Sequence, residues 1–300
     1  MTRRVLLLSH AARADLQLHT REMAALLGAA GIEVAVLARD AEVAQLDMAN
    51  LVPADPHHPA LGCELVCVLG GDGTILRGAE LSRGVGAPLL GVNFGHVGFL
   101  AEAEREDLAA TVERIVAADY AVEERMTLDV IARCGDEVIA ASWALNEVTV
   151  EKAARERMLE LSLEIDGHPL STWGCDGVIM ATPTGSTAYA FSAGGPVVWP
   201  DVEAMLLVPI SAHALFARPL VVGPDSQVAV ELIPGATARA VMWCDGARPV
   251  DLPKEARVEV SRSQTPVRLA RLTTDPFTDR LVTKFDLSVA GWRGVLRQDL

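Results

Sequence analysis

The chain has 300 residues, of which 50% are hydrophobic, 4% aromatic and 22% charged, and its formal net charge is −14. At roughly 150 residues per domain this length favours two domains, and the apolar content excludes a wholly disordered chain. Proteins that bind nucleic acid usually carry a basic surplus, so the charge argues against a nucleic-acid partner. A nucleotide site in so acidic a chain would need compensation from backbone N–H groups, a few arginines or a metal ion.

The cysteine count and the apolar runs predict the compartment. Five cysteines are present, an odd number without a Cys-x-x-Cys pair, which argues against a disulfide framework or a structural zinc site. The apolar run 5–8 is shorter than the roughly 7–15 residues of a signal-peptide core. The longest apolar stretch, 204–217, is interrupted by Pro209 and His213 and falls short of the ~18 residues of a membrane span. We therefore expect a cytoplasmic protein with reduced thiols and no membrane partner.

The first third of the chain alternates short apolar runs with helical patterns. Strands are expected at 3–8, 32–37, 64–69 and 88–92, and helices at 15–27 and 106–118. Apolar strands separated by helices predict an α/β domain with a parallel, Rossmann-like sheet that is covered on both faces. Ligands of such sheets bind at the carboxyl ends of the strands.

After about residue 120 the pattern changes to short, partly alternating strands separated by turn residues. These strands are expected at 127–133, 137–144, 159–165, 227–233, 239–244 and 257–261. They predict a mostly antiparallel β-sandwich. Phe277, Leu281 and Phe285 then repeat at helical spacing, and we expect this C-terminal helix to return to the first domain. The expected domains are 1–120 plus 273–300, which is α/β, and 121–272, which is β-rich.

A glycine-rich loop follows the strand at 64–69 and leads into a helix. Its phosphate-facing residues are expected to be Gly70, Gly71, Gly73 and Thr74. Glycines let the backbone approach a ligand closely, and the N–H groups at a helix start attract phosphate. The loop lacks the Gly-Lys-Ser/Thr of a Walker motif and does not have the full dinucleotide spacing.

Asp72 is the informative residue of this loop. A carboxylate among phosphate-facing glycines is unfavourable unless it holds a metal ion or accepts a proton from a nucleophile. The alternative is that Asp72-Gly73 is simply a favourable turn pair. Arg77, one helical turn later, either reaches a phosphate or is an ordinary solvated helix residue.

A second glycine-rich segment, 91–100, leaves the next strand, so we expect it beside Asp72. It contains His96, for which a structural role competes with proton transfer. Further along, Asn146-Glu147 ends the apolar strand 138–145 and forms either a turn or a clamp for a ribose and base.

The segment 175–196 is rich in hydroxyl groups. In it Ser186 or Thr187 is expected to cap a short helix, and Tyr189 offers a flat face for a purine or pyridine ring. A capped core helix with a packing tyrosine is the structural alternative, although it leaves the number of hydroxyl groups in one loop unexplained.

Together these segments resemble the NAD kinase family. The Gly-Gly-Asp-Gly-Thr loop is shared with diacylglycerol and sphingosine kinases and, in similar form, with 6-phosphofructokinases. Its combination with 93–100, 146–147 and 176–189 is specific to NAD kinases, and the resemblance covers nearly the whole chain. It implies phosphoryl transfer from ATP, or in some members polyphosphate, to the 2′-hydroxyl of the adenosine ribose of NAD, giving NADP.

The resemblance also implies the cofactor and the assembly. Mg²⁺ is expected to arrive with the phosphoryl donor, because the sequence contains no dedicated metal-binding motif. A homodimer or homotetramer is the assembly that the family implies.

The same resemblance implies roles for individual residues. Asp72 resembles the proton acceptor, and Gly73 lies against the same ribose. Asn146 and Glu147 resemble contacts to the adenosine of NAD, and Asp176 resembles a residue near the nicotinamide. The other implied NAD contacts are Thr187, Ala188, Tyr189 and Ser192 in the adenine pocket, the polar residues Arg77 and Arg157 (with Arg155 competing for the second place), and Phe99 and Asp245, the latter in a motif that reaches across subunits in oligomeric members.

Two other functions compete with this interpretation. A lipid kinase would want an apolar acyl slot or a basic membrane-facing patch, and neither is evident at a net charge of −14. A dinucleotide-binding sensor without catalysis would gain nothing from a carboxylate beside phosphates, so Asp72 argues against it.

Overall fold

The computed structural model describes residues 2–9, 14–44, 46, 51–93, 98–101, 103–104, 108–154, 157–233 and 239–289. The chain divides into two compact units, 1–124 with 267–300, and 125–266. Residues 121–124 and 267–272, which we expected in the β-rich domain, belong to the first unit. The reason is that the strands containing them, β7 and β20, extend the sheet of that unit.

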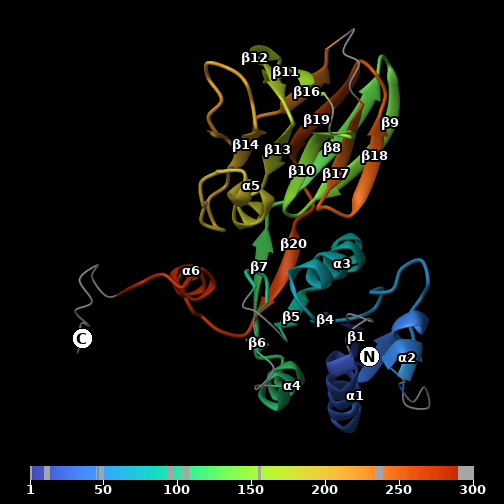
Figure 1. Ribbon diagram of the computed structural model, residues 1–300. Coiled ribbons are helices and arrows are strands. Elements are labelled where there is room, and N and C mark those ends of the chain that lie inside the picture. The colour runs from blue at the N-terminus through green and yellow to red at the C-terminus, as the bar shows by residue number, and fades with distance from the viewer. Residues whose placement is uncertain are drawn as a thin grey trace. The chain divides into compact units, whose positions relative to one another are not determined.

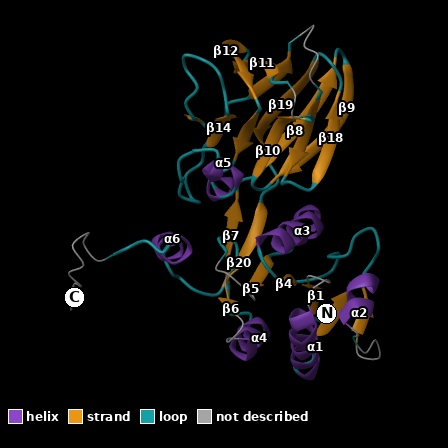
Figure 2. Cartoon of the chain, in the orientation of Figure 1, coloured by secondary structure: helices purple, strands orange, loops and turns teal. Residues whose placement is uncertain are grey.

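The first unit is built on one sheet with helices along it (Figures 1 and 2). Its strands are β1 (Arg4–Ser9), β2 (Glu33–Val36), β3 (Leu51–Pro53), β4 (Leu65–Leu69), β5 (Leu89–Asn93), β6 (Ala103–Glu104), β7 (Ala121–Arg125) and β20 (Val267–Arg271). Its helices are α1 (Ala14–Ala29), α2 (Ala38–Ala44), α3 (Asp72–Ser82), the 3₁₀ turn η2 (Arg83–Val85), α4 (Leu108–Ala117) and α6 (Phe277–Phe285). The strand order is β3-β2-β1-β4-β5-β20-β7, with β6 also paired to β5.

The strands of this sheet are parallel wherever their register is defined, as the sequence predicts. Strands β1, β4 and β5 are buried almost along their whole length, because helices cover the central strands. Short elements such as α2, β3 and β6 were not predicted, because segments this short carry too few residues for a clear period.

Helix α3 packs closely against the sheet at Gly78. A β-carbon added to Gly78 would lie 2.6 Å from Val68 Cγ2 and 2.7 Å from Leu89 Cδ1. A side chain at this position would therefore force these two core side chains to move where α3 crosses β4 and β5. Helix α3 begins at Asp72, so only Gly70 and Gly71 separate its N-terminus from the carboxyl end of β4.

The second unit is a sandwich of two six-stranded sheets. One has the order β15-β14-β13-β10-β17-β18, comprising β15 (Leu220–Val222), β14 (Met205–Ile210), β13 (Gly177–Ala181), β10 (Glu147–Lys152), β17 (Ala240–Cys244) and β18 (Arg248–Leu252). The other has the order β12-β11-β16-β19-β8-β9, comprising β12 (His168–Cys175), β11 (Leu159–Ile165), β16 (Val228–Leu232), β19 (Ala256–Arg262), β8 (Leu128–Cys134) and β9 (Glu137–Ala144). The strand pairs of both sheets are antiparallel, which confirms the predicted sandwich.

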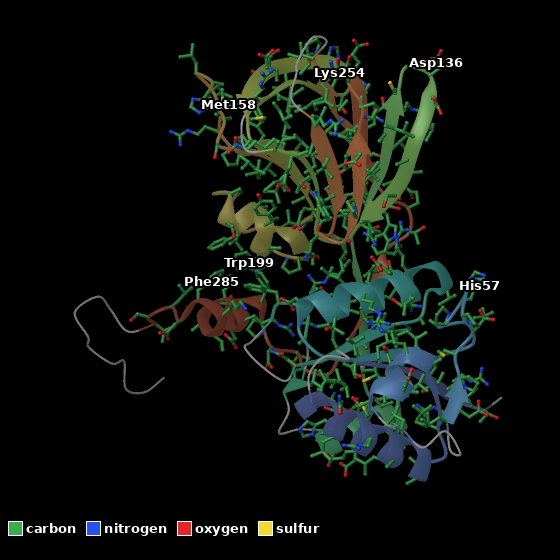
Figure 3. All side chains as sticks on the ribbon, turned by 45° about the vertical axis from the view of Figure 1, so that its right-hand side comes forward. His57, Asp136, Met158, Trp199, Lys254 and Phe285 are labelled. Atoms are coloured by element: carbon green, nitrogen blue, oxygen red, sulfur yellow. The ribbon has the colours of Figure 1, made fainter. Side chains whose placement is uncertain are left out.

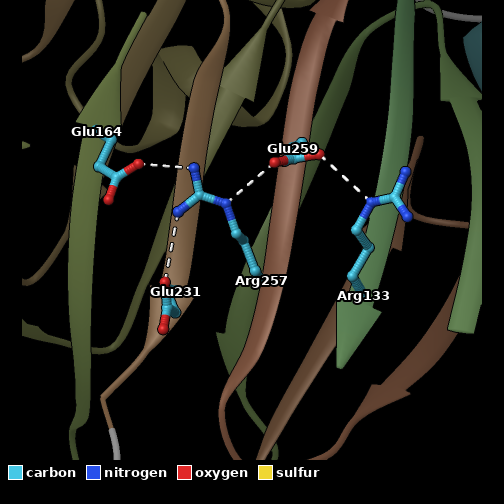
Figure 4. A network of polar contacts seen from close by, with 5 residues as sticks. All are labelled: Arg133, Glu164, Glu231, Arg257 and Glu259. Atoms are coloured by element: carbon cyan, nitrogen blue, oxygen red, sulfur yellow. Dashed lines mark hydrogen bonds and ion pairs between the residues drawn. The ribbon is translucent and has the colours of Figure 1, made fainter. Parts of the chain in front are cut away.

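The alternation of each strand explains why the two sheets pack. Val148 and Val150 of β10 enter one core with Val258 and Val260 of β19, and both pairs are at most 1% exposed. The opposite face of the β8–β19 sheet carries charges instead. There Arg257 bridges Glu164, Glu231 and Glu259, and Glu259 also contacts Arg133, as Figure 4 shows. One face is therefore core and the other is a charged surface.

The outer face of the other sheet is covered by a short helical segment. The turn η4 (Thr184–Thr187) and helix α5 (Tyr189–Ser192) follow β13 directly. Ala190 packs there against Ile179 and Ala181 of β13 and Leu206 and Val208 of β14. This packing places the hydroxyl-rich segment over the sheet.

The C-terminal helix α6 belongs to the first unit, as predicted. Phe277 and Phe285 of α6 each lie with their ring centroid 5.8 Å from that of Phe99, and Phe285 is labelled in Figure 3. In the part of the chain that the structure describes, no helix is long and apolar enough to cross a membrane.

Candidate functional site

Asp72 begins helix α3 immediately after the two glycines that end β4. Gly71 is the N-cap, and its carbonyl accepts the N–H groups of Thr74 and Ile75 at 2.9 and 3.1 Å. The backbone thus closes the first helical turn without the Asp72 side chain. The carboxylate is therefore left for contacts elsewhere.

Those contacts come from the second glycine-rich segment. The N–H of Phe99 donates to Asp72 Oδ2 and the N–H of Leu100 donates to Asp72 Oδ1, each at 3.3 Å. A β-carbon on Gly98 would lie 2.3 Å from Asp72 Oδ1. The prediction that this segment lies beside Asp72 is confirmed for residues 98–101, whereas His96 lies outside the described residues.

The Asp72 carboxylate keeps capacity for a reacting group. The residue is partly exposed, and each of its oxygens accepts one backbone N–H at the long end of the hydrogen-bond range. Because an ionised carboxylate offers about four acceptor positions, it can accept a further hydrogen bond from a hydroxyl group and then take up the proton of that group. Asp72 is therefore oriented by backbone hydrogen bonds and still has acceptor positions free, as a general base requires.

Arg77 contacts a buried carboxylate, so it is not an ordinary solvated helix residue. Its guanidinium contacts Asp40 Oδ1 at 3.4 Å through both terminal nitrogens. Burial raises the pKa of Asp40, and Arg77 opposes that shift. Arg77 therefore serves as the counter-ion of a buried carboxyl group on α2, with 40% of its own side chain exposed.

In the second unit, three strand ends meet at the predicted Asn146-Glu147 pair. Glu147 begins β10 instead of ending the preceding strand, because β9 stops at Ala144 and the chain turns at 145–146. Strand β10 pairs with β13 on one side and β17 on the other, which brings Thr182 and Asp245 to the same end of the sheet. The N–H of Thr182 donates to the Asn146 carbonyl at 2.9 Å.

Asp245 fixes the backbone of this turn. Its Oδ1 accepts the N–H groups of Asn146 and Glu147 at 2.7 and 3.3 Å, and its Oδ2 accepts that of Leu145 at 3.0 Å. Arg248 donates to Asp245 Oδ2 at 2.9 Å and to the Trp143 carbonyl at 2.7 Å. Burial raises the pKa of Asp245, while these N–H groups and Arg248 act to lower it. The hydrogen bonds of Asp245 thus fix the backbone of residues 145–147.

Glu147 is a buried carboxyl group with incomplete hydrogen bonding. Burial, followed by the nearby Asp245 carboxylate, raises its pKa to about 8, and a backbone hydrogen bond from Tyr189 acts in the opposite direction. Its Oε2 has no hydrogen-bond partner among the described residues. Such an atom is satisfied when a ligand supplies a partner.

The hydroxyl-rich segment is tied to the same turn. Thr182 Oγ1 donates to the Leu145 carbonyl at 2.5 Å and accepts the Gly185 N–H at 3.1 Å. A β-carbon on Gly185 would lie 2.0 Å from the Asn146 carbonyl oxygen, so only glycine fits there. The residues Asn146, Thr182 and Gly185 form one rigid corner.

The predicted helix cap by Ser186 or Thr187 is wrong. Ala188 is the N-cap of α5. Ser186 Oγ donates to the Pro183 carbonyl at 2.6 Å and accepts the Val198 N–H at 2.9 Å, and Thr187 Oγ1 donates to the Thr184 carbonyl at 3.3 Å. Both hydroxyl groups stabilise the η4 turn, because the chain makes that turn before α5 begins.

The predicted adenine-pocket residues form the accessible edge of this segment. Thr187 and Ala188 are partly exposed, and Tyr189 and Ser192 are exposed. The Tyr189 phenol is hydrogen bonded to Glu151, and its pKa is raised, first by burial and then by the carboxylates around it. An exposed aromatic ring beside fixed polar groups can stack against a flat ring.

At the other end of β10, Lys152 Nζ contacts Asp176 Oδ1 at 2.5 Å. Asp176 is therefore charge-compensated by a residue that the sequence interpretation missed. Arg157 is exposed, and its competitor Arg155 lies outside the described residues. Lys152, Gly185 and Arg248 were all missed, although Gly185 stands inside the hydroxyl-rich motif. Among these three residues, only Gly185 could have been noticed from the sequence, because it directly follows Thr184 in that motif.

The donor set for a metal ion is limited. In the described ranges, no three His, Cys, Asp or Glu side chains are grouped to hold a metal ion. Asp72 is the one carboxylate of the glycine-rich loop, and Asp72 Oδ1 and Oδ2 are the protein atoms there with the chemistry of a Mg²⁺ ligand.

Comparisons with known proteins agree on one family. The family described as the ATP-NAD kinase N-terminal domain matches residues 17–120, and that described as the ATP-NAD kinase C-terminal domain matches residues 145–272. The NAD kinase of Thermobifida fusca is 59% identical over 300 residues, covering 97% of this chain and 92% of its own. The NAD kinase of Mycobacterium leprae is 51% identical over 304 residues, covering 97% of each chain.

Solved structures share the fold. An NAD kinase from Archaeoglobus fulgidus in complex with ATP has a TM-score of 0.71 at 26% identity, covering 94% of this chain and 98% of its own. A yeast NADH kinase complexed with NADH has a TM-score of 0.84 at 23% identity, covering 100% of this chain and 90% of its own. The second likeness bears on the fold alone.

Proposed function

This chain belongs to the NAD kinase family, and we propose that it transfers the terminal phosphoryl group of ATP to the 2′-hydroxyl of the adenosine ribose of NAD, giving NADP. The observation that carries the proposal is the Asp72 carboxylate at the start of α3, held by two backbone N–H groups and still able to accept a proton.

Asp72 is the proposed proton acceptor. As the 2′-oxygen attacks the terminal phosphorus, its proton passes to Asp72, and the bond from phosphorus to the leaving oxygen of ADP breaks. Phosphoryl transfer depends mainly on positioning and charge neutralisation. The two N–H groups of 98–101 supply the positioning, because they set the rotation of the carboxylate.

The loop residues Gly70, Gly71, Gly73 and Thr74 are the proposed phosphate-facing group. They stand at the N-terminus of an eleven-residue helix, where the backbone N–H groups and the helix dipole favour negative charge. Mg²⁺ carried by the donor phosphates would offset their charge next to Asp72. Asp72 is the protein group that would meet that ion.

In the second unit, the proposed NAD-binding groups are Asn146, Glu147, Asp176 and the exposed edge formed by Thr187, Ala188, Tyr189 and Ser192. The unpartnered Glu147 Oε2 supports this assignment, because a hydroxyl or amine of the ligand would complete its hydrogen bonding. We also propose Gly73, Phe99, Arg77 and Arg157 as contacts. For Asp245 we propose an indirect part, through the backbone that it holds.

The net charge and the exposed apolar side chains bear on the partners and the assembly of the protein. The net charge of −14 supports small nucleotides over nucleic acid as partners, and polyphosphate is proposed as a second phosphoryl donor. Exposed large apolar side chains between 189 and 221 support a homodimer or homotetramer: Phe191, Trp199, Val202, Leu215, Phe216 and Val221. Trp199 is marked in Figure 3. We propose a cytoplasmic location.

The proposal is tested by incubating purified protein and NAD with Mg-ATP, or in parallel with Mg-polyphosphate, and measuring NADP by an NADP-specific dehydrogenase. We expect NADP with ATP, with the new phosphate on the adenosine ribose by ³¹P NMR. NAD binding without NADP from either donor would contradict the proposal and favour a dinucleotide sensor. Light scattering of the same sample measures the subunit number.

A further inference from the structure

A single peptide group connects the C-terminal helix to Asp72. Its N–H, that of Leu100, donates to Asp72 Oδ1 at 3.3 Å. Its carbonyl, that of Phe99, accepts Arg280 Nη1 at 3.1 Å, and the same nitrogen donates to the Ala101 carbonyl at 2.9 Å. The hydrogen-bond series runs from the Arg280 guanidinium through the 99–100 peptide to the Asp72 carboxylate.

The series has opposite charges at its two ends. A cation at a peptide carbonyl polarises the amide and makes its N–H a stronger donor, and hydrogen bonds in such chains strengthen one another by roughly 10–30%. A carboxylate at the N–H end benefits from this polarisation. Arg280 therefore strengthens the hydrogen bond to Asp72 through the peptide group that its guanidinium contacts.

Helix α6 also restrains the loop by packing. The Phe99 ring contacts those of Phe277 and Phe285, which are eight residues, or about two turns, apart on α6. Arg280 stands between these two phenylalanines along the helix, so the apolar and polar contacts fix the same residues, 99–101. Gly98 completes the arrangement, because its lack of a β-carbon lets the segment approach the carboxylate.

We propose that Arg280 is a positioning residue for phosphoryl transfer, acting on Asp72 through the Phe99–Leu100 peptide. This inference rests on the proposed function of Asp72. It assigns to the C-terminal helix a part in catalysis without contact with either substrate. Loss of Arg280 then lowers kcat more than it weakens substrate binding, since an ångström of misplacement at a reacting group lowers the rate by up to about 100-fold.

The test compares Arg280→Ala and Arg280→Lys with wild type, and Lys284→Gln removes a positive charge from an exposed position of the same helix as a matched control. We expect Arg280→Ala to lower kcat about 10-fold or more, with the KM values for NAD and ATP changed less than about 3-fold. Arg280→Lys recovers part of kcat, and millimolar guanidinium restores part of kcat to Arg280→Ala while leaving wild type and Lys284→Gln unchanged.

A second readout covers the case in which Arg280→Ala folds poorly. Hydrogen exchange of the Phe99 and Leu100 amides is expected to be faster in Arg280→Lys than in wild type, with β1 and β4 unchanged. An unchanged kcat in Arg280→Ala, or a loss of kcat that guanidinium does not restore and that KM shares, would overturn the role of Arg280. Wild-type protein that forms no NADP would instead overturn the proposed function itself.

Discussion

Gly98 lies so close to Asp72 that a β-carbon on Gly98 would be 2.3 Å from Asp72 Oδ1 and 3.0 Å from its carboxyl carbon. The atoms met by that β-carbon belong to the end of a side chain that can rotate, and not to the backbone. The expected response to a larger residue is therefore displacement of the carboxylate with the fold retained.

Gly98→Ala accordingly separates catalysis from stability. We expect kcat to fall about 10- to 100-fold, because Asp72 leaves the position set by the Phe99 and Leu100 amides, while the midpoint of urea unfolding changes little. Steady-state NADP formation and urea titration measure the two effects. Gly84→Ala is the control, since a β-carbon there meets no atom within 4 Å. An active Gly98→Ala protein would show that the carboxylate position is not critical.

Gly185→Ala is expected to act differently, because the added β-carbon would lie 2.0 Å from the Asn146 carbonyl oxygen and 2.5 Å from its carbon. The backbone at Asn146 or Gly185 must therefore move. We expect a loss of about 1–3 kcal/mol in the free energy of unfolding, and weaker NAD binding. Urea unfolding and calorimetric titration with NAD check both. Gly223→Ala, which meets no neighbour, is the control. An unchanged affinity for NAD would show that the contact between Gly185 and Asn146 does not contribute to NAD binding.

The glycine positions also show what could be predicted from the sequence. Buried apolar strands and the loop at 69–74 follow from local pattern, and parallel topology places residues that follow β4 and β5 at one edge. This topology predicted that the second glycine-rich segment lies beside Asp72, as the structure shows for residues 98–101. The local pattern also singled out Asp72, whereas the ligand roles expected for Asn146 and Glu147 came from the resemblance to NAD kinases.

The residues that support the site could not be predicted in the same way. Arg280 is 181 residues from Phe99, and Asp245 is 99 residues from Asn146 in sequence. For Arg77, the spacing from Gly73 left both a phosphate contact and a solvated position open, and it did not reveal the contact with Asp40, which lies on another helix. Contacts across such separations depend on tertiary packing, which a local period does not encode.

Glu147 makes stability depend on pH. Its carboxyl group keeps its proton in the folded protein up to pH about 8, against 4.5 ordinarily, so between these values the folded state binds more protons than the unfolded state. The free energy of unfolding therefore falls as pH rises through this window. We expect wild type to lose stability relative to Glu147→Gln from pH 4.5 to 8, by about 1.4 kcal/mol for each pH unit, and no further above pH 8.

Urea unfolding at each pH from 4.5 to 9 measures this difference. Glu160→Gln, at an exposed position of β11, is the control and should show no comparable trend. A Glu147→Gln curve that runs parallel to wild type across the window would mean that Glu147 is ionised in the folded protein.

Asp245→Asn should weaken NAD binding through the backbone. One amide oxygen cannot accept the three N–H groups that the two carboxylate oxygens accept, and Arg248 loses its ionic partner. We expect about 3–5 kcal/mol less stability and a higher Kd for NAD, measured by urea unfolding and calorimetry. Asp251→Asn, exposed on β18, is the control. Full stability with weak NAD binding would instead indicate direct contact between Asp245 and the ligand.

The most direct test of the central claim is the turnover of Asp72→Asn with Mg-ATP and NAD. The variant preserves shape but cannot take the proton of the 2′-hydroxyl. We predict a kcat lower by about 10²–10⁴ with a Kd for NAD within about 3-fold of wild type. NADP formation by Asp72→Asn at the wild-type rate would contradict the assignment of Asp72 as the proton acceptor.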